Sequence, residues 1–411
     1  MATESLYSER DTEAGPLAGV RVIDLTIARA GPTCVRQLAD MGADVIRVSS
    51  PGRFDLGGSD AFNLHRDKRS VLLDLKHVRG REVFYSLADR ADVLVENFRS
   101  SVKRRLGIDY ETLAARNPRL IYASLSGFGQ EGPYADRPGV DQIAQGMGGL
   151  MSVTGPPDSQ PWRAGIAVSD TASGTFLAQG VLAALYVRER TGRGQWVHTS
   201  LLEAMVNFMD FQAARWLMDG VVPRQAGNEH PTLTPMGAFE TLDGLINLAV
   251  LDGWDRFVQA LGVPELGDDP RFREFETRVR HRDALRDIVA RRLRERTTAE
   301  WTQVFTDADL PCGPILSMDE VFADAQVAHL SLTRRVQHPD LGEMELLRHP
   351  VTWSETPAGV HGPPPNPGEH TREVLAELGL GDQEVEELLA CGAAGEARRE
   401  DSEPPAVGDA S

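Results

Sequence analysis

The sequence predicts an α/β protein whose main domain is a parallel β-sheet flanked by helices. Short apolar runs typical of buried strands occupy residues 20–26 and 44–48. A helical pattern over residues 33–41 separates them and begins after Gly31-Pro32. Because strands separated by helices pair in parallel, this pattern is typical of a Rossmann-like domain.

The same alternation continues along the first half of the chain. Strands are predicted over residues 70–75, 93–96 and 120–126, with a helix around residues 81–88. A long helix then covers residues 169–190 and ends before a glycine, which is a common stop signal.

An apolar helix is predicted over residues 201–218, after a short strand over residues 195–199. Glu203, Asp210 and Arg215 interrupt its apolar character, so it suits a protein core or interface better than a bilayer. No run reaches the roughly 18 uninterrupted apolar residues of a membrane span.

A smaller α+β domain is predicted beyond Gly227. Its first element is a hairpin that pairs residues 238–241 with residues 245–250 across Asp243-Gly244. Amphipathic helices follow from residue 254 to about residue 305.

Composition predicts which segments are linkers and that both ends are disordered. The proline-rich stretch 354–368 favours extended chain, and a last helical segment covers residues 371–389. Both ends carry too little apolar surface to offset the entropy of ordering. The predicted parts are a disordered N-terminus (1–15), a large Rossmann-like domain (16–200, completed by 369–392), a linker helix (201–226), a small domain (227–330), a return linker (331–368) and a disordered tail (393–411).

Charge and cysteine content restrict the partners and the compartment. The 411-residue chain has a formal net charge of −18, so most of its surface would repel a nucleic-acid backbone. Cys34, Cys312 and Cys391 form no CxxC pair, which fits a reducing compartment. The N-terminus also lacks the apolar core of a signal peptide. We therefore expect a cytoplasmic protein with no nucleic-acid or membrane partner.

Three common catalytic motifs are incomplete or absent from the sequence. Segment 127–132 matches GxGxxG after a strand, but Pro133 and Pro138 follow, so a loop is favoured over a dinucleotide site. The ten histidines form no HExxH motif and no cluster with ligand spacing, so no metal is expected. A GxSxG nucleophile elbow is also lacking.

Asp170 is the catalytic candidate that remains. It stands at the start of the long predicted helix, where its ordinary role is to cap free amide groups. The same place suits a nucleophile, because a carboxylate with a pKa near about 3.9 is ionised at neutral pH and needs no general base. Gly165, Ala172 and Gly174 around it either leave room for a bulky substrate or serve close helix packing.

A group of basic residues is conspicuous in so acidic a chain. These residues form either a phosphate-binding group or a solvated helix face. They are Arg99, Lys103, Arg104 and Arg105, with Arg47, Lys68 and Arg69 as weaker candidates near strand ends.

Short segments along most of the chain match one enzyme family. They are LAGVRVIDLT (17–26), AGP (30–32), LADMGADVIR (38–47), KRS (68–70), VENFR (95–99), GFG (127–129), GPY (132–134), AAL (183–185), TGRGQ (191–195) and GEHT (368–371). On these segments the chain resembles the family III CoA transferases, the formyl-CoA transferase-like group. The resemblance implies a transferase that uses coenzyme A or an acyl-CoA as substrate, with no permanently bound cofactor.

The resemblance assigns the nucleophile. The family's catalytic aspartate ends a G-x-x-x-x-D sequence before a helix, and Asp170 stands there. The implied reaction is acyl-CoA:carboxylate CoA transfer, in which this carboxylate attacks the thioester to give an aspartyl anhydride and then an aspartyl-CoA thioester. A donor acyl-CoA and an acceptor carboxylic acid are the implied partners.

The resemblance also implies a coenzyme A site and an interlocked ring-like homodimer. Ser49 and Ser50 depart from the acidic and basic residues usual there, and Arg29 is larger than the family's glutamine. Residues 228–232 replace the glycine-rich loop of the formyl-CoA enzymes, which argues against formyl-CoA as substrate. The residues matching positions that line coenzyme A are Ala28, Arg29, Arg47, Leu73, Asn97, Phe98 and Arg105.

Two alternatives remain, an acyl-CoA racemase or isomerase of the same fold and a CoA-binding protein without turnover. Racemases carry a Gly-His-Asp sequence that here reads Gly139-Val140-Asp141. Proton exchange needs a second acid/base, so Val140 favours transfer. Asp141 either supports the reaction centre or makes a loop hydrogen bond.

Overall fold

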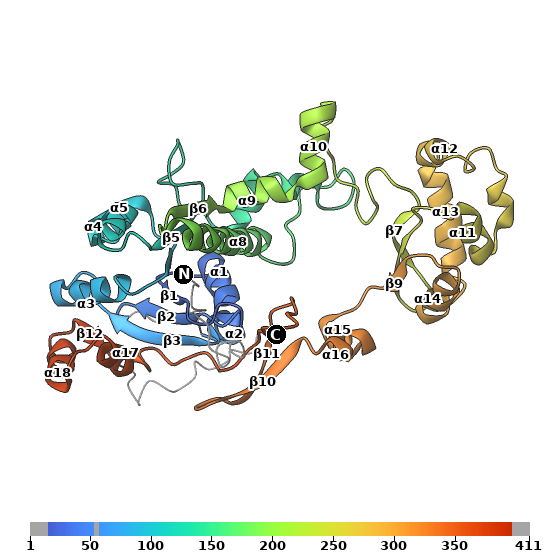
Figure 1. Ribbon diagram of the computed structural model, residues 1–411. Coiled ribbons are helices and arrows are strands. Elements are labelled where there is room, and N and C mark those ends of the chain that lie inside the picture. The colour runs from blue at the N-terminus through green and yellow to red at the C-terminus, as the bar shows by residue number, and fades with distance from the viewer. Residues whose placement is uncertain (1–14, 53–56, 397–411) are drawn as a thin grey trace. The chain divides into compact units, whose positions relative to one another are not determined.

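A computed structural model describes residues 15–52 and 57–396 (Figure 1). The chain divides into two compact units. Among the described residues, the large unit comprises 15–52, 57–149, 165–213 and 331–396, and the small unit comprises Leu150–Ala164 and Ala214–Leu330. Within the described ranges, no helix is both long and apolar enough to cross a membrane.

A seven-stranded sheet forms the centre of the large unit. Its strands are β1 (Arg21–Asp24), β2 (Asp44–Ser49), β3 (Lys68–Leu73), β4 (Val93–Glu96), β5 (Ile121–Ser126), β6 (Trp196–Ser200) and β12 (Ala394–Gly395). Their spatial order is β12-β3-β2-β1-β4-β5-β6, and all pairs except β12 with β3 are parallel. The predicted α/β class with a mainly parallel sheet is confirmed.

Helices cover both faces of this sheet because its strands are apolar on both sides. Successive strand residues point to opposite faces, so Val22 and Val45 pack in one core, and Ile23 and Ile46 pack in the other. The first core also contains α1 (Ala30–Asp40), α8 (Val168–Thr191) and the start of α9 (Leu201–Phe208). The second contains α3 (Val78–Ala88), α5 (Tyr110–Arg116), α17 (Thr371–Glu377) and α18 (Asp382–Ala390).

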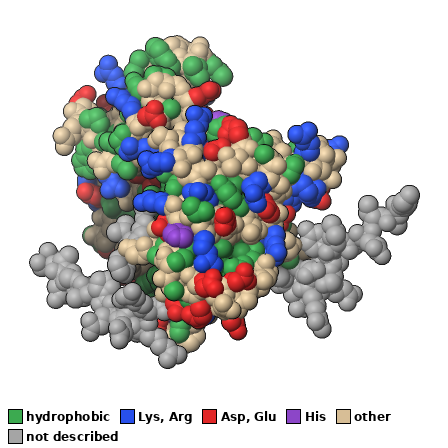
Figure 2. Space-filling view, turned by 90° about the vertical axis from the view of Figure 1, so that its left-hand side faces the viewer, with side chains coloured by type: hydrophobic (Ala, Val, Ile, Leu, Met, Phe, Trp, Pro, Cys, Tyr) green, Lys and Arg blue, Asp and Glu red, His purple; other side chains and the backbone are tan. Residues whose placement is uncertain are grey.

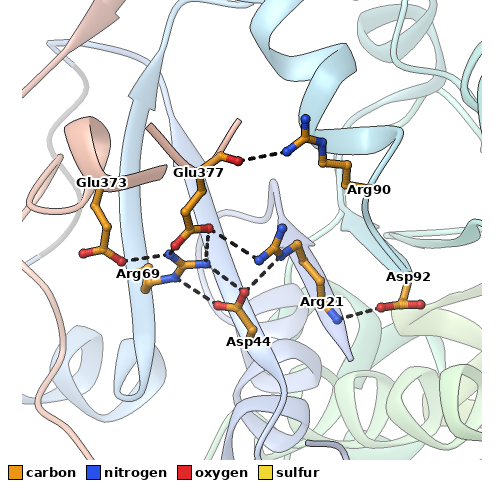
Figure 3. Close-up of polar contacts among 7 residues, drawn as sticks. All are labelled: Arg21, Asp44, Arg69, Arg90, Asp92, Glu373 and Glu377. Carbon is orange, nitrogen blue, oxygen red and sulfur yellow. Dashed lines mark hydrogen bonds and ion pairs between the residues drawn. The ribbon is translucent and has the colours of Figure 1, made fainter. Parts of the chain in front are cut away.

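Ion pairs tie α17 to the sheet (Figure 3). Arg69 on β3 donates to Asp44 on β2 at 2.9 and 2.7 Å, and to Glu373 and Glu377 at 2.9 and 2.6 Å. Arg21 on β1 binds the same Asp44 carboxylate at 3.0 Å. The Arg69 guanidinium therefore serves the fold, and the weaker prediction of a phosphate contact is wrong for it.

The apolar helix predicted over residues 201–218 is two helices, α9 and α10 (Asp210–Asp219). Asp210 has a φ of 43°, a left-handed conformation that ends a right-handed helix and that aspartate tolerates better than most residues. Helix α9 buries Leu201, Ala204 and Met205, whereas no residue of α10 is buried.

The C-terminal segment also differs from its prediction. The helix expected over residues 371–389 is broken at Gly379, and the expected return linker contains an antiparallel hairpin of β10 (Thr333–His338) and β11 (Gly342–Leu347). The disordered tail is wrong for its first residues, since Ala393 is buried and Ala394 pairs with Leu73. The rest of that predicted tail and residues 1–14 lie outside the described residues.

The small unit has its own sheet and core. Strands β7 (Met236–Glu240) and β8 (Leu245–Ala249) form the predicted hairpin, and β9 (Cys312–Pro314) pairs antiparallel with β8. Its core centres on Phe257, Trp301 and Phe305. The surrounding helices include α11 (Trp254–Leu261), α12 (Phe275–Arg280), α13 (Arg282–Leu293) and α14 (Thr298–Asp307).

Close packing of α1 against α8 explains one of the small residues near Asp170. A Cβ added at Gly174 would lie 2.6 Å from the carbonyl oxygen of Ala30 and 2.8 Å from the Cβ of Thr33. Gly174 therefore serves helix packing. A Cβ at Gly180, farther along the same helix, meets no atom within 4 Å.

We expect Gly174→Ala to lower the free energy of unfolding by about 1–3 kcal/mol, because the methyl group overpacks the contact. Gly180→Ala is the matched control and is expected to be neutral or to stabilise by up to about 1 kcal/mol. Urea unfolding of both variants measures the difference, and equal effects would contradict the packing explanation.

Candidate active site

The loops after β1 and β4 meet where the order of the strands reverses. Asn97, directly after β4, accepts a hydrogen bond from the Ile27 N–H at 3.0 Å and donates one to the Ile27 carbonyl at 2.8 Å. This bridge fixes the loop that carries Ala28, whose φ is 61°. Ligands of open parallel sheets bind outside the carboxyl ends of the strands at such a reversal.

Three of the residues predicted to contact coenzyme A reach the surface. Ala28 is exposed in the loop after β1, and Arg29 next to it pairs with Asp60 on α2 (Ser59–His65). Arg105 is exposed in the last turn of α4 (Ser100–Leu106).

The side chains of the other four residues are buried or already make contacts within the protein. The Asn97 amide is used by Ile27, and Phe98 packs against the core. Arg47 is buried on β2. The Leu73 side chain is buried in the core at the sheet edge, so a ligand contact there would have to come from its backbone.

Two of the basic residues are buried in internal ion pairs. The Lys103 ammonium lies 2.9 Å from Glu96 Oε1 and over the ring of Trp196. The Lys68 ammonium lies 2.9 Å from Asp24 Oδ2, with both side chains fully buried. The prediction of phosphate contact is therefore wrong for both lysines, and neither belongs to a solvated face.

The remaining members of the basic stretch are exposed at α4. On the face of the molecule drawn in Figure 2, basic, acidic and apolar side chains are interspersed. The exposed residues are Arg99, Arg104 and Arg105.

Asp170 lies in the first turn of α8 and is half-buried. The alternative role, a side-chain cap for this helix, is not taken by Asp170, because Asp141 on α6 (Asp141–Met147) takes it. Asp141 Oδ1 accepts hydrogen bonds from the Ser169 N–H at 2.9 Å and the Ser169 hydroxyl at 2.8 Å. Within the described part of the chain, no group donates a hydrogen bond to the Asp170 carboxylate.

The environment of Asp170 raises its pKa to about 6, above the ordinary range of an aspartate. Burial is the largest cause, and the negative charges of Asp141 and Asp60 act in the same direction. Arg29 acts in the opposite direction. The expectation of an ordinary pKa is wrong, although a carboxyl with this pKa is still mostly ionised at pH 7.

The GxGxxG segment is a loop, as predicted. A Cβ at Gly127 would lie only 2.7 Å from the Cα of Gly139. These glycines therefore allow two backbone segments to touch, immediately before Val140 and the start of α6. This contact lies two residues before Asp141 in the chain.

The small unit contains a cavity of about 480 Å³. Segment 227–230 lines it together with parts of β7, β8 and β9. Within this segment Glu229 pairs with Arg286 at 2.7 Å. The loop that replaces the family's glycine-rich segment is thus held by an ion pair. Across the described ranges, no group of three His, Cys, Asp or Glu residues is placed to hold a metal.

Comparison with known proteins agrees with the motifs. A family model described as CoA-transferase family III matches residues 17–371. The succinate–glutarate CoA-transferase of Agrobacterium fabrum is 39% identical over 388 residues, which cover 88% of this chain and 96% of that protein. The succinyl-CoA:glutarate CoA-transferase of Mus musculus is 35% identical, with 92% and 89% covered.

A solved structure shares the architecture. The crystal structure of a CAIB/BAIF family protein from Brucella suis has a TM-score of 0.80 and 34% sequence identity, covering 89% of this chain and 100% of that one. With the family motifs, the sheet order and these relatives in agreement, the chain belongs to CoA-transferase family III and is a CoA-transferase.

Proposed function

We propose that this enzyme moves CoA from an acyl-CoA to a carboxylic acid, with Asp170 as the covalent nucleophile. The observation that carries this proposal is a half-buried carboxylate that is mostly ionised at neutral pH and receives no hydrogen bond from the described residues. Arg29, in the loop after β1, acts to lower the pKa of this carboxyl, which supports a site at that loop. A carboxylate in this state is free to attack a thioester.

The reaction proceeds by exchange of acyl bonds and needs no external oxidant or ATP. An Asp170 oxygen attacks the thioester carbonyl, the C–S bond breaks, and an aspartyl anhydride and CoA thiolate form. The thiolate attacks the aspartyl carbonyl and expels the donor carboxylate. The acceptor carboxylate attacks the resulting aspartyl-CoA thioester and releases the thiolate, which opens the second anhydride to give the new acyl-CoA and free Asp170.

The electrostatics of the site favour these intermediates. Burial and neighbouring carboxylates penalise the charged form of Asp170 in the free enzyme. In the anhydride and thioester states that side chain carries no charge, so the penalty disappears. The site therefore raises the free energy of the resting carboxylate relative to its acylated forms.

For coenzyme A, we propose the sheet reversal as the binding region. Ala28 and Arg29 border it from the loop after β1, and Asn97 fixes that loop. Arg105 offers an exposed guanidinium for a phosphate. Phe98, Arg47 and the Leu73 backbone complete the proposed contacts.

Dicarboxylic acids are the proposed substrate class. The names of the Agrobacterium and mouse relatives pair succinate or succinyl-CoA with glutarate. Other relatives are named for mesaconate, citramalate and oxalate, which are also dicarboxylates. Succinyl-CoA is therefore the first donor to test and glutarate the first acceptor.

The dimer implied by the resemblance is supported by exposed apolar residues. Trp216 is 55% exposed, Leu217 78% and Met218 83% on α10, which has no buried residue. Large apolar side chains at such exposure favour a surface covered by another chain. We infer that these residues lie in a homodimer interface.

The proposed function predicts exchange of CoA between acids in a simple mixture. With succinyl-CoA and glutarate, chromatography is expected to detect glutaryl-CoA and succinate in equal amounts, with no ATP added. Val140 replaces the racemase histidine, so the acyl α-carbon is expected not to exchange deuterium. Deuterium exchange without any transfer to a panel of dicarboxylates would contradict the proposal.

A further inference from the structure

The first turn of α8, which carries Asp170, contacts Asp141 on α6. Asp141 Oδ1 lies 2.9 Å from the Ser169 nitrogen and 3.4 Å from the Asp170 nitrogen. These amides lie in the first turn of α8, where the N–H groups have no partner within the helix. In an ordinary helix they bind a cap residue or water. A carboxylate from α6 therefore caps α8 from outside.

Asp141 is itself fixed by buried groups. Gln145, one turn later on α6, donates from Nε2 to Asp141 Oδ2 at 2.6 Å and to the Ile166 carbonyl at 3.2 Å. Gln145 and Ser169 are both fully buried. Asp141 is thus held on both oxygens, one toward α8 and one toward its own helix.

We propose that Asp141 is a positioning residue for the transfer reaction, because it holds a negative charge at the start of α8, beside Asp170, and repels the charge of that carboxylate. The proposal rests on the nucleophilic role of Asp170. A carboxylate that accepts two or three backbone hydrogen bonds is strongly stabilised as the anion and is a correspondingly weak nucleophile. The Asp170 carboxylate accepts no such bond from the described residues, and the charge of Asp141 disfavours its anion further.

Charge acts in the same direction as hydrogen bonding. Among the described residues, the charged groups that act on the pKa of Asp170 are Asp141 from α6, Asp60 from α2 and Arg29 before α1. Acylation removes the charge of Asp170 and relieves its repulsion by Asp141 in every covalent intermediate. Neutralising Asp141 is therefore expected to stabilise the resting carboxylate and to slow its attack.

The test is the rate of adduct formation at Asp170 as a function of pH, measured by quenching single turnovers with succinyl-CoA and mass spectrometry. In the wild type the rate rises with pH through the pKa of Asp170. Asp141→Asn keeps an acceptor oxygen for Ser169 but removes the charge. We expect the midpoint to move down by about one pH unit and the plateau rate to fall by about tenfold.

Three further variants separate positioning from folding. Asp141→Ser, a neutral residue that also caps helices, is expected to shift the midpoint in the same direction. Asp141→Glu keeps the charge and is expected to keep the wild-type midpoint. Asp109 caps α5, and its carboxylate accepts a hydrogen bond from the Thr112 N–H at 3.1 Å. The control variant Asp109→Asn is expected to change neither the pH midpoint nor the rate.

A purely structural Asp141 would lower stability and leave the pH midpoint in place. An unchanged midpoint in both neutral variants, with adduct still formed, would overturn the inference while leaving the nucleophile intact. An adduct that persists in Asp170→Ala would instead refute the proposed nucleophile, and the positioning role with it.

Discussion

An Asp170→Asn variant is expected to lose CoA transfer by about a thousandfold or more and to become more stable at pH 8. The activity is lost because a carboxamide does not replace a carboxylate nucleophile. The stability is gained because the folded protein disfavours the charge that asparagine lacks. A catalytic group that destabilises its own fold is expected to show both effects together.

The sign of the stability change follows from the direction of the pKa shift. The pKa of Asp170 rises from 3.8 to about 6 on folding, so between these values the folded state binds more protons than the unfolded state. Wild-type stability therefore falls as pH rises through this window, and the cost is fully present above pH 6. Two pH units correspond to roughly 3 kcal/mol, so a gain of about 1–3 kcal/mol is expected.

Urea unfolding of both proteins at pH 4 and pH 8 measures this linkage. The stability difference is expected to be large at pH 8 and small at pH 4. Asp109→Asn, at a helix cap with no part in the site, is expected to show no pH-dependent gain. The same pH dependence in the wild type and Asp170→Asn would show that Asp170 is not held in an unfavourable environment.

Lys68→Met is expected to lower the free energy of unfolding by about 3–5 kcal/mol, the largest stability effect proposed for this chain. The variant leaves the fully buried Asp24 without its ammonium partner at 2.9 Å. The Asp24 carboxylate also accepts from the Thr26 N–H at 2.8 Å, immediately before the loop that contains Ala28. Loss of the pair is therefore expected to raise the KM for acyl-CoA as well.

Two controls define the origin of this effect. Lys76→Met removes an exposed lysine and is expected to change stability by less than about 0.5 kcal/mol. Lys68→Met combined with Asp24→Asn removes the orphaned charge and is expected to recover part of the loss. If the double variant were as unstable as the sum of the two single variants, an uncompensated buried charge would not be the cause.

Local sequence signals predicted the large sheet well. Apolar runs and helix start and stop signals within each segment predict the strands and α1, α3 and α8. Most predicted bounds differ from the observed ones by a few residues. The failures have non-local causes. Ala394 pairs with Leu73 at the edge of β3, a residue far away in the sequence. The composition of the tail, taken as a whole, gives no signal for this strand.

Charged residues were the least predictable part of the candidate site. A lysine is usually exposed, and only the folded chain brings Glu96 to Lys103 and Asp24 to Lys68. Asp141 and Ser169 are 28 residues apart, so no spacing rule links them. The Asp-x-x-x-Gln spacing of Asp141 and Gln145 is the one local signal that places two polar groups on one helix face.

The most direct test of the account is intact-protein mass spectrometry after mixing the enzyme with succinyl-CoA, with and without hydroxylamine, beside Asp170→Ala. The account predicts a covalent CoA adduct on the wild type that hydroxylamine removes, with peptide mapping to Asp170, and no adduct on the variant. A CoA adduct of equal yield on Asp170→Ala, or glutaryl-CoA formation by that variant at the wild-type rate, would contradict it.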